Sequence, residues 1–262
     1  MSAVDPDRLL VDRLEGFTKA ILRPKCSGGV ELVGSGSVLK VADRLYLLTA
    51  AHVLDLADEK MPLLLQTVEK LVPVSGTAIT SPKSHARRRS DDQVDLAVVA
   101  LPSEYLAHFP IGSYLTESNL ETDRPVARQK GFLFLGYPES KNRKVARALS
   151  SEIAPFLYGA TCHEAQESMY AKLKLSPSDS LLLTFDPKRM RSRAGDKRPP
   201  APSLRGLSGT PIWGVTADGV GVVVSVLIEH HKAEKKCVIS TRVSRFLDAI
   251  STLQRLQMSG DA

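Results

Sequence analysis

Short apolar runs that end at turn residues fill most of this chain, and they constrain its fold more than any other feature. From Gly28 onward, runs such as RLYLLTA, VDLAVVAL, GFLFLGYP and VGVVVSVLIEH alternate with glycine, proline and polar clusters. Their length and their content of valine, leucine and isoleucine are typical of buried strands. Many such strands at fairly regular spacing predict an all-β barrel or sandwich.

Helical spacing of apolar residues interrupts this pattern at both ends of the chain. Residues 6–22 are predicted to form an amphipathic helix that runs into a strand, and residues 244–258 a second helix. A further helical patch covers residues 162–175. The polar segment 124–130 lies between two groups of strands, so we expect it to link two halves of the molecule.

Composition places the chain among ordinary globular proteins of the cytoplasm. It has 262 residues, 43% of them hydrophobic, which is enough for a sizeable core. Its three cysteines, Cys26, Cys162 and Cys237, are too few and too scattered for a disulfide framework. The first residues do not resemble a secretory signal, and the longest apolar run is shorter than the ~20 residues that span a bilayer. We therefore expect a cytoplasmic protein with no membrane partner.

Charge and histidine placement argue against two classes of binding protein. The net charge of +6 is concentrated in residues 81–90 and 186–198. Neither segment contains interleaved aromatic residues that would stack on bases, so we expect no nucleic-acid partner, although a basic β protein whose binding weakens with salt stays an alternative. His230 and His231 point to opposite faces of a strand and would chelate poorly with Cys237. We expect no metal and no cofactor.

Three stretches carry residues that can act together in catalysis. In LYLLTAAHVLD, an apolar strand runs into small residues and then His52, which leaves room for the imidazole to face a cleft. In DDQVDLAVVALP, Asp95 lies at the mouth of an apolar strand, where a carboxylate is costly to bury without a partner. In LRGLSGTPIWG, Ser208 lies between glycines, a pattern that also suits an ordinary turn.

These residue types meet the needs of acyl transfer. A serine hydroxyl is a weak nucleophile until a neighbouring base accepts its proton. Histidine accepts protons near neutral pH, and a buried aspartate holds its imidazole in the correct tautomer. Backbone N–H groups of glycines beside the serine can stabilise the oxyanion that develops.

The three stretches resemble the motifs of the chymotrypsin/trypsin-like serine peptidases. LTAAHV resembles the histidine motif of that family, DLAVV its aspartate motif, and GLSGTP its serine motif, Gly-Asp-Ser-Gly-Gly-Pro. Their order along the chain is also that of the family. VISTRVSRFLDAI resembles its last strand and C-terminal helix, so that the resemblance covers roughly residues 18–252 and is nearest to bacterial, non-secreted members.

The resemblance implies an all-β fold of two packed antiparallel six-stranded β-barrels, with the site between them and a helix at each end. It divides the chain into a helical extension over 1–17, a first barrel over 18–123, the linker over 124–130, and a second barrel with the C-terminal helix over 131–262. It implies a serine endopeptidase that acts on protein or peptide substrates through an acyl-enzyme.

Individual roles follow from the same match. Ser208 resembles the nucleophile, His52 the base and Asp95 the orienting acid. The backbone N–H groups of Gly206 and Ser208 would form the oxyanion hole.

The chain departs from the family pattern beside the nucleophile and in the specificity pocket. Leu207 replaces an aspartate that, in many secreted members, receives a freshly cut N-terminus, so we do not expect activation by that route. Pro202 corresponds to the base of the specificity pocket, and Val238 is another pocket-facing position. Because both are uncharged, we expect an apolar or small residue at the cleavage position.

Two alternatives concern regulation and activity. The basic segment 186–198 precedes Ser208 closely, and we hypothesise that substrate or an acidic regulatory partner orders it; it would otherwise be an ordinary solvated loop. The chain as a whole could instead be a catalytically silent peptidase fold that binds peptides or proteins, although its three motifs are intact.

Overall fold

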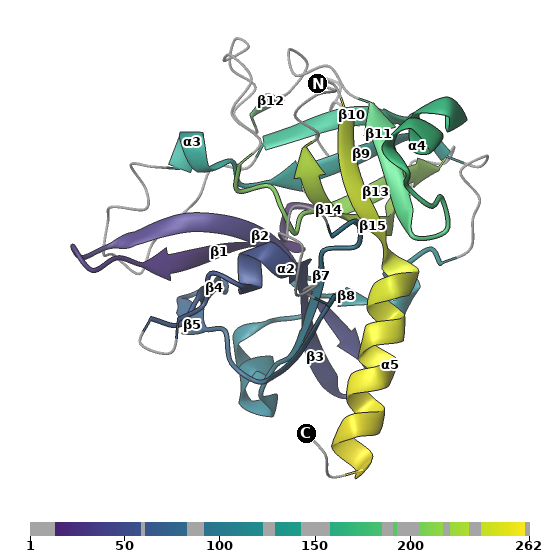
Figure 1. Ribbon diagram of the computed structural model, residues 1–262. Helices are drawn as coiled ribbons and strands as arrows, with labels where there is room; N and C mark the ends of the chain where they lie inside the picture. Colours follow the sequence, from purple (N-terminus) through teal and green to yellow (C-terminus); the bar gives the residue numbers. More distant parts are fainter. Residues whose placement is uncertain are drawn as a thin grey trace, which may run out of the picture.

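The described strands form two β-sheets, which lie one above the other in Figure 1. The structure is a computed structural model. It describes residues 14–58, 61–82, 92–122, 129–142, 158–184, 191–192, 205–216, 221–230 and 237–259.

The first sheet has eight strands in the order β5-β4-β1-β2-β3-β7-β6, with β8 paired to β2. Its two ends are not paired with each other within the described residues, so it is a partly open barrel. The strands are β1 (Thr18–Pro24), β2 (Val30–Val41), β3 (Arg44–Ala50), β4 (Leu64–Gln66), β5 (Leu71–Pro73), β6 (Thr77–Thr80), β7 (Leu96–Ala100) and β8 (Leu115–Thr116).

The second sheet has seven strands in the order β11-β15-β14-β13-β9-β10-β12, and a pairing of β11 with β10 closes six of them into a barrel. The strands are β9 (Gln129–Gly136), β10 (Tyr158–Glu164), β11 (Ser180–Thr184), β12 (Arg191–Ser192), β13 (Pro211–Thr216), β14 (Gly221–His230) and β15 (Cys237–Arg242). Short helices lie between strands, and a long one ends the described chain: α2 (Ala51–Leu54), η2 (Ser103–His108), η3 (Glu117–Asn119), α3 (Glu139–Asn142), α4 (Glu167–Leu173) and α5 (Val243–Ser259).

The expected strands and helices are found with some shifts. The predicted helix over 6–22 gives way to strand β1 at Thr18, and its first eight residues lie outside the described part. The patch over 162–175 was predicted as helical, but β10 continues to Glu164 and helix α4 begins only at Glu167. Cys162 pairs there with β9, and His163 and Glu164 pair with β11, so tertiary contacts override the local helical pattern. Of the segment 124–130, only the last two residues are described, as the start of β9.

Close packing of β2 against its neighbours explains the glycines in GSGSVLK. A Cβ at Gly34 would lie 2.6 Å from Val53 Cγ1, and a Cβ at Gly36 would lie 3.1 Å from the carbonyl oxygen of Leu48. Real Cβ atoms essentially never approach a neighbour as closely as at Gly34, and the approach at Gly36 is tighter than most, so both positions favour glycine. Strand β2 therefore continues through both glycines as one strand of 12 residues.

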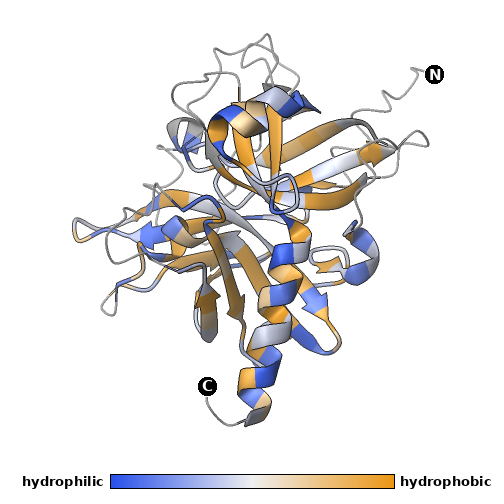
Figure 2. Cartoon of the chain, turned by 45° about the vertical axis from the view of Figure 1, so that its right-hand side comes forward, coloured by the Kyte–Doolittle hydropathy of each residue, from blue (hydrophilic) through white to orange (hydrophobic). Residues whose placement is uncertain are grey.

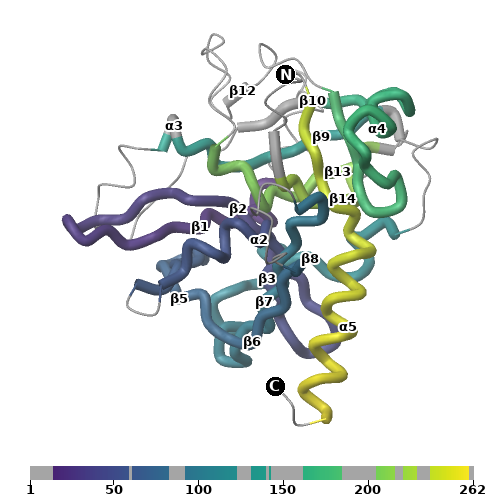
Figure 3. The backbone as a smooth tube through the Cα atoms, viewed as in Figure 1, coloured from purple at the N-terminus to yellow at the C-terminus, as the bar shows by residue number. Residues whose placement is uncertain are grey.

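Helix α5 joins the two sheets. It follows β15 of the second barrel and runs down along the first, as the yellow helix in Figures 1 and 3 shows. Phe246, Ile250 and Leu253 are buried in one cluster with Tyr46 and Val98 of the first sheet. Figure 2 shows apolar and polar residues alternating along this helix, as expected of an amphipathic helix with one face in the core.

One charged side chain lies inside the first barrel. Lys19 on β1 is only 5% exposed; its Nζ donates to the carbonyl oxygen of Gly16 at 2.6 Å and lies 5.7 Å from the ring centroid of Phe109. Burial lowers the pKa of Lys19 from 10.5 to about 8. Burial of this charge therefore opposes folding at neutral pH.

Lys19→Met should make the chain more stable at pH 7, and the gain should shrink as the pH rises. Between about 8 and 10.5 the unfolded parent holds the Lys19 proton while the folded parent releases it, so parental stability increases with pH across this window. The total change is on the order of 3 kcal/mol. Urea unfolding of both chains at several pH values measures it.

Ile21→Met is the matched control, because Ile21 lies two residues along the same strand, is buried and carries no charge. Its stability should run parallel to that of the parent between pH 8 and 10.5. If the stability of Lys19→Met ran parallel to that of the parent over this pH range, the buried charge at Lys19 would be contradicted.

Candidate active site

His52 and Asp95 meet at the edge of the first barrel. Strand β3 ends at Ala50, and His52 lies in the short helix α2 that follows it, while Asp95 lies just before β7, the neighbour of β3. The Asp95 carboxylate accepts two hydrogen bonds from His52, from the backbone N–H at 2.9 Å and from ring Nδ1 at 2.5 Å. Because Nδ1–H donates to the carboxylate, Nε2 is the ring nitrogen left to accept a proton.

The backbone at Asp95 takes a conformation that side chains rarely adopt. Its φ is +40°, in the left-handed region, while its carbonyl oxygen accepts a hydrogen bond from Ala51 N–H at 2.8 Å. The residue is 5% exposed, so its charge is stabilised by its hydrogen bonds rather than by water. Strain of this kind persists where surrounding contacts hold it, often at functional sites.

Ser208 belongs to a turn that packs directly on strand β2 of the first barrel. Its carbonyl oxygen accepts a hydrogen bond from Ser35 N–H at 2.8 Å. A Cβ at Gly34 would lie 3.3 Å from the same oxygen and 2.6 Å from Val53, the residue after His52. The serine turn, β2 and the helix that carries His52 therefore meet at one point.

Two glycines allow this contact. Gly209 has a φ of +92°, and a Cβ there would overlap the carbonyl oxygen of Ser35. Gly206 has a φ of +88°, and a Cβ there would lie 2.6 Å from the carbonyl oxygen of Tyr137. Both glycines are required by conformation and by space.

Leu207 between them is fully buried in the second barrel. It lies in a cluster with Phe134, Leu183 and Val238. Leu207 thus anchors the turn by apolar contact rather than by an ion pair.

The structure leaves the Ser208 side chain half-buried. Within the described ranges, Ser208 Oγ and the His52 imidazole form no hydrogen bond with each other. Such bonds are often long before substrate binds and tighten in the complex.

The expected specificity residues fall in different places. Pro202 lies outside the described residues. Val238 on β15 is fully buried opposite Leu183, in the core of the second barrel. The segment 186–198 lies outside the described residues except for Arg191–Ser192, which form β12.

Other reactive groups in the described chain are poorly placed for catalysis. Burial raises the pKa of the Cys162 thiol to about 12, so it stays protonated at neutral pH and is a poor nucleophile. No group of three histidine, cysteine or acidic side chains in this part of the chain is placed to hold a metal ion. No helix within the described ranges is long and apolar enough to cross a bilayer.

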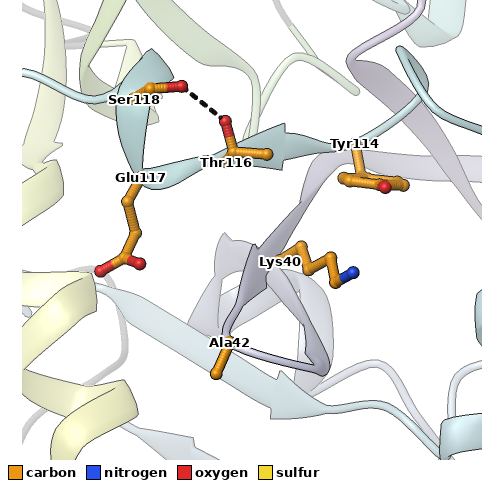
Figure 4. Close-up of a pocket in the computed structure, with 6 residues that line it drawn as sticks. All are labelled: Lys40, Ala42, Tyr114, Thr116, Glu117 and Ser118. Carbon is orange, nitrogen blue, oxygen red and sulfur yellow. Dashed lines mark hydrogen bonds between the residues drawn. The ribbon is translucent and has the colours of Figure 1, made fainter.

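An open hollow of about 460 Å³ lies elsewhere on the first barrel. Figure 4 shows its lining, with the hydroxyls of Thr116 and Ser118 hydrogen-bonded to each other at 2.8 Å. None of His52, Asp95 and Ser208 lines it, so we do not assign it to the site. Its lining residues are Lys40, Ala42, Tyr114, Thr116, Glu117 and Ser118.

Comparison with known proteins gives a match at the level of structure alone. No protein-family model matches the chain, and no curated protein sequence does. Among solved structures, the active form of the Rv3671c protease from M. tuberculosis matches with a TM-score of 0.52 at 17% identity, covering 94% of this chain and 84% of that one. The serine endoprotease from Yersinia pestis matches with a TM-score of 0.53 at 12% identity, covering 97% and 68%.

Kallikrein-related peptidase 10 matches with a TM-score of 0.53 at 13% identity, covering 93% of this chain and 97% of that one. The chain has a chymotrypsin-like fold. The expected two-barrel architecture is thereby confirmed, with the second barrel closed and the first more open. Structural matches at identities this low show the fold alone. The chemistry of the site therefore has to be inferred from the residues of this chain.

Sequence reasoning missed one residue at this site. Ser35, in GSGSVLK, is fully buried and donates its hydroxyl to the carbonyl oxygen of Gly206 at 2.8 Å. The two residues are 171 positions apart. The only signal in the sequence was a serine among small residues, which has many other uses.

Gly209→Ala should destabilise the fold far more than Gly28→Ala. Both glycines have left-handed backbones, with φ of +92° and +85°, so an alanine costs ~1–2 kcal/mol at each. At Gly209 the new Cβ also overlaps Ser35, whereas at Gly28 nothing lies within 4 Å. We expect a difference of at least about 2 kcal/mol between the two variants in chemical unfolding. Equal losses would refute the close contact between the turn and β2.

Proposed function

We propose that the chain is a serine endopeptidase that hydrolyses protein or peptide substrates through a Ser208–His52–Asp95 triad. The observation that carries the proposal is the pair of hydrogen bonds by which Asp95 holds His52. They fix the ring with Nε2 free, which is the arrangement a general base for serine needs. The turn that carries Ser208 packs on β2, beside the helix that carries His52, and this position supports a role of Ser208 as the nucleophile.

In the proposed reaction, His52 accepts the Ser208 proton as Oγ attacks the scissile carbonyl. The Asp95 carboxylate stabilises the imidazolium that forms, and the N–H groups of Gly206 and Ser208 donate to the oxyanion. The imidazolium then protonates the leaving amine, and water hydrolyses the acyl-enzyme by the same route in reverse.

An unpaired strand edge beside Ser208 supports a protein or peptide substrate. Strand β13 begins at Pro211, opposite Val226, whereas β14 continues to His230. Gly209 N–H donates to the carbonyl oxygen of Leu227, so this continuation starts next to the serine turn. In the described part of the chain, no strand covers β14 beyond Leu227 on this side, and an extended peptide can add there as another strand.

An apolar or small residue at the cleavage position stays our expectation. It rests on the uncharged Pro202 and Val238, the two positions that the sequence match gives to the specificity pocket.

We also propose a cytoplasmic setting and regulation through the segment 186–198. Cys26, Cys162 and Cys237 form no disulfide in the described part of the chain, which supports a reducing compartment. An acidic partner stays the complementary ligand for the basic segment.

A catalytically silent binding module is the second candidate. The unpaired edge of β14 would serve it equally well, because peptide capture needs strand addition and no chemistry. The buried, doubly hydrogen-bonded Asp95 favours the enzyme, because a binding module has no use for a held imidazole.

Ser208→Ala should abolish peptide hydrolysis and leave the fold intact. Loss of the nucleophile from such a triad costs ~10⁶ in turnover. Hydrolysis of a fluorescence-quenched protein substrate measures the loss, with the melting temperature as the control for folding.

His52→Ala should be nearly as damaging, and Asp95→Asn should cost ~10⁴ by favouring the wrong tautomer. Hydrolysis by Ser208→Ala at the parental rate would contradict the proposed peptidase function.

A further inference from the structure

Ser35 uses every polar group it has at the junction between the first barrel and the serine turn. Its N–H donates to the Ser208 carbonyl oxygen, and its carbonyl oxygen accepts from Thr49 Oγ1, both at 2.8 Å. Its hydroxyl donates to the carbonyl oxygen of Gly206 at 2.8 Å and accepts from Tyr137 N–H at 3.3 Å. The residue is fully buried, so no water competes for these bonds.

These contacts hold the peptide groups on both sides of Gly206. The carbonyl oxygen of Arg205 accepts from Glu139 N–H at 2.7 Å, which fixes the peptide before Gly206. Because C=O and N–H of a trans peptide point in opposite directions, the Gly206 N–H is turned away from Glu139. The Ser35 hydroxyl fixes the peptide after Gly206.

A glycine needs such external bonds more than other residues do. Gly206 has no side chain to restrict its backbone and has a φ of +88°. If the bond from Ser35 is lost, the peptide after Gly206 can move, and the peptide before it is then held by the bond between Arg205 and Glu139, about which it can tilt and carry the Gly206 N–H out of position. Leu207 anchors the next residue only by apolar packing, which does not fix the direction of a carbonyl group.

We propose that Ser35 is a positioning residue for the oxyanion hole: its hydroxyl holds the Gly206 carbonyl group, and Gly206, held in this way, presents its N–H to the reacting carbonyl. This inference rests on the proposed peptidase function. It explains how the turn is ordered in a chain where Leu207 offers no partner to an N-terminal ammonium group. The first barrel thus supplies His52 and Asp95 and also the group that sets the donor geometry for Ser208.

A fluorescent fluorophosphonate tests the two proposals separately. This reagent phosphonylates an activated serine, and its phosphoryl oxygen occupies the oxyanion site during attack. Labelling of the parent at Ser208, absent in Ser208→Ala, comes first. A parent that is not labelled at Ser208 overturns the proposed function, and the inference with it.

Ser35→Ala removes the hydroxyl and keeps the backbone N–H that binds Ser208. We expect its maximal rate of labelling, at saturating reagent, to fall at least about tenfold, because a displaced oxyanion donor stabilises the transition state less. The reagent concentration at half-maximal rate should change less than threefold, because ground-state binding does not use the oxyanion donor. A purely structural role would not separate the two constants in this way.

Ser37→Ala is the matched control. Ser37 lies two residues along the same strand, is equally buried, and its hydroxyl has no hydrogen-bond partner among the described residues. Its labelling constants should stay within twofold of the parent. Ser35→Cys preserves the shape of the side chain with a weaker donor, so its maximal rate of labelling should lie between those of Ser35→Ala and the parent. It replaces Ser35→Ala in the test if the alanine variant does not fold.

Two results overturn the inference while the proposed function stands. One is a folded Ser35→Ala or Ser35→Cys chain that is labelled within twofold of the parental maximal rate. The other is an equal loss in Ser37→Ala, which would show that any buried hydroxyl of β2 matters only for packing.

Discussion

The contact between strand β2 and the turn at Ser208 is the constraint on which the geometry of the site depends. His52 and Asp95 belong to the first barrel, and Ser208 belongs to a turn at the edge of the second. A hydrogen bond from Ser35 N–H to Ser208, and glycines where backbones nearly touch, bring the two together. Neither barrel holds all three residues, so the site exists only when the barrels are docked in this register.

Apolar burial takes the place of an ion pair in this turn. Leu207 is fully buried among residues of the second barrel, and burial of a leucine contributes roughly 2 kcal/mol. This contribution is present as soon as the barrel folds and does not depend on pH or on a new chain terminus. The direction of the peptide groups in this turn is set by hydrogen bonds instead, from Ser35 on one side of Gly206 and from Glu139 on the other.

The sequence alone was sufficient for the two-barrel fold and for naming the candidate residues His52, Asp95 and Ser208, because short motifs in a fixed order carry that information. It did not reveal the role of Ser35, because its bond to Gly206 depends on docking segments 171 residues apart. Burial of Lys19 was equally hidden, since a lysine is ordinarily exposed and only the arrangement of Gly16 and Phe109 encloses it. The helical pattern over 162–175 gave a wrong prediction at its start, where strand pairing with β9 and β11 outweighs local preference.

Helix α5 has a consequence for how the protein is made. It follows Ser208 and every strand of both barrels in the chain, yet its apolar face completes the core around Tyr46 and Val98 of the first barrel. A chain emerging from the ribosome therefore carries all three candidate residues before the barrel that holds two of them is covered. Strands β14 and β15 also follow Ser208, so both barrels are completed only after all three candidate residues have been synthesised.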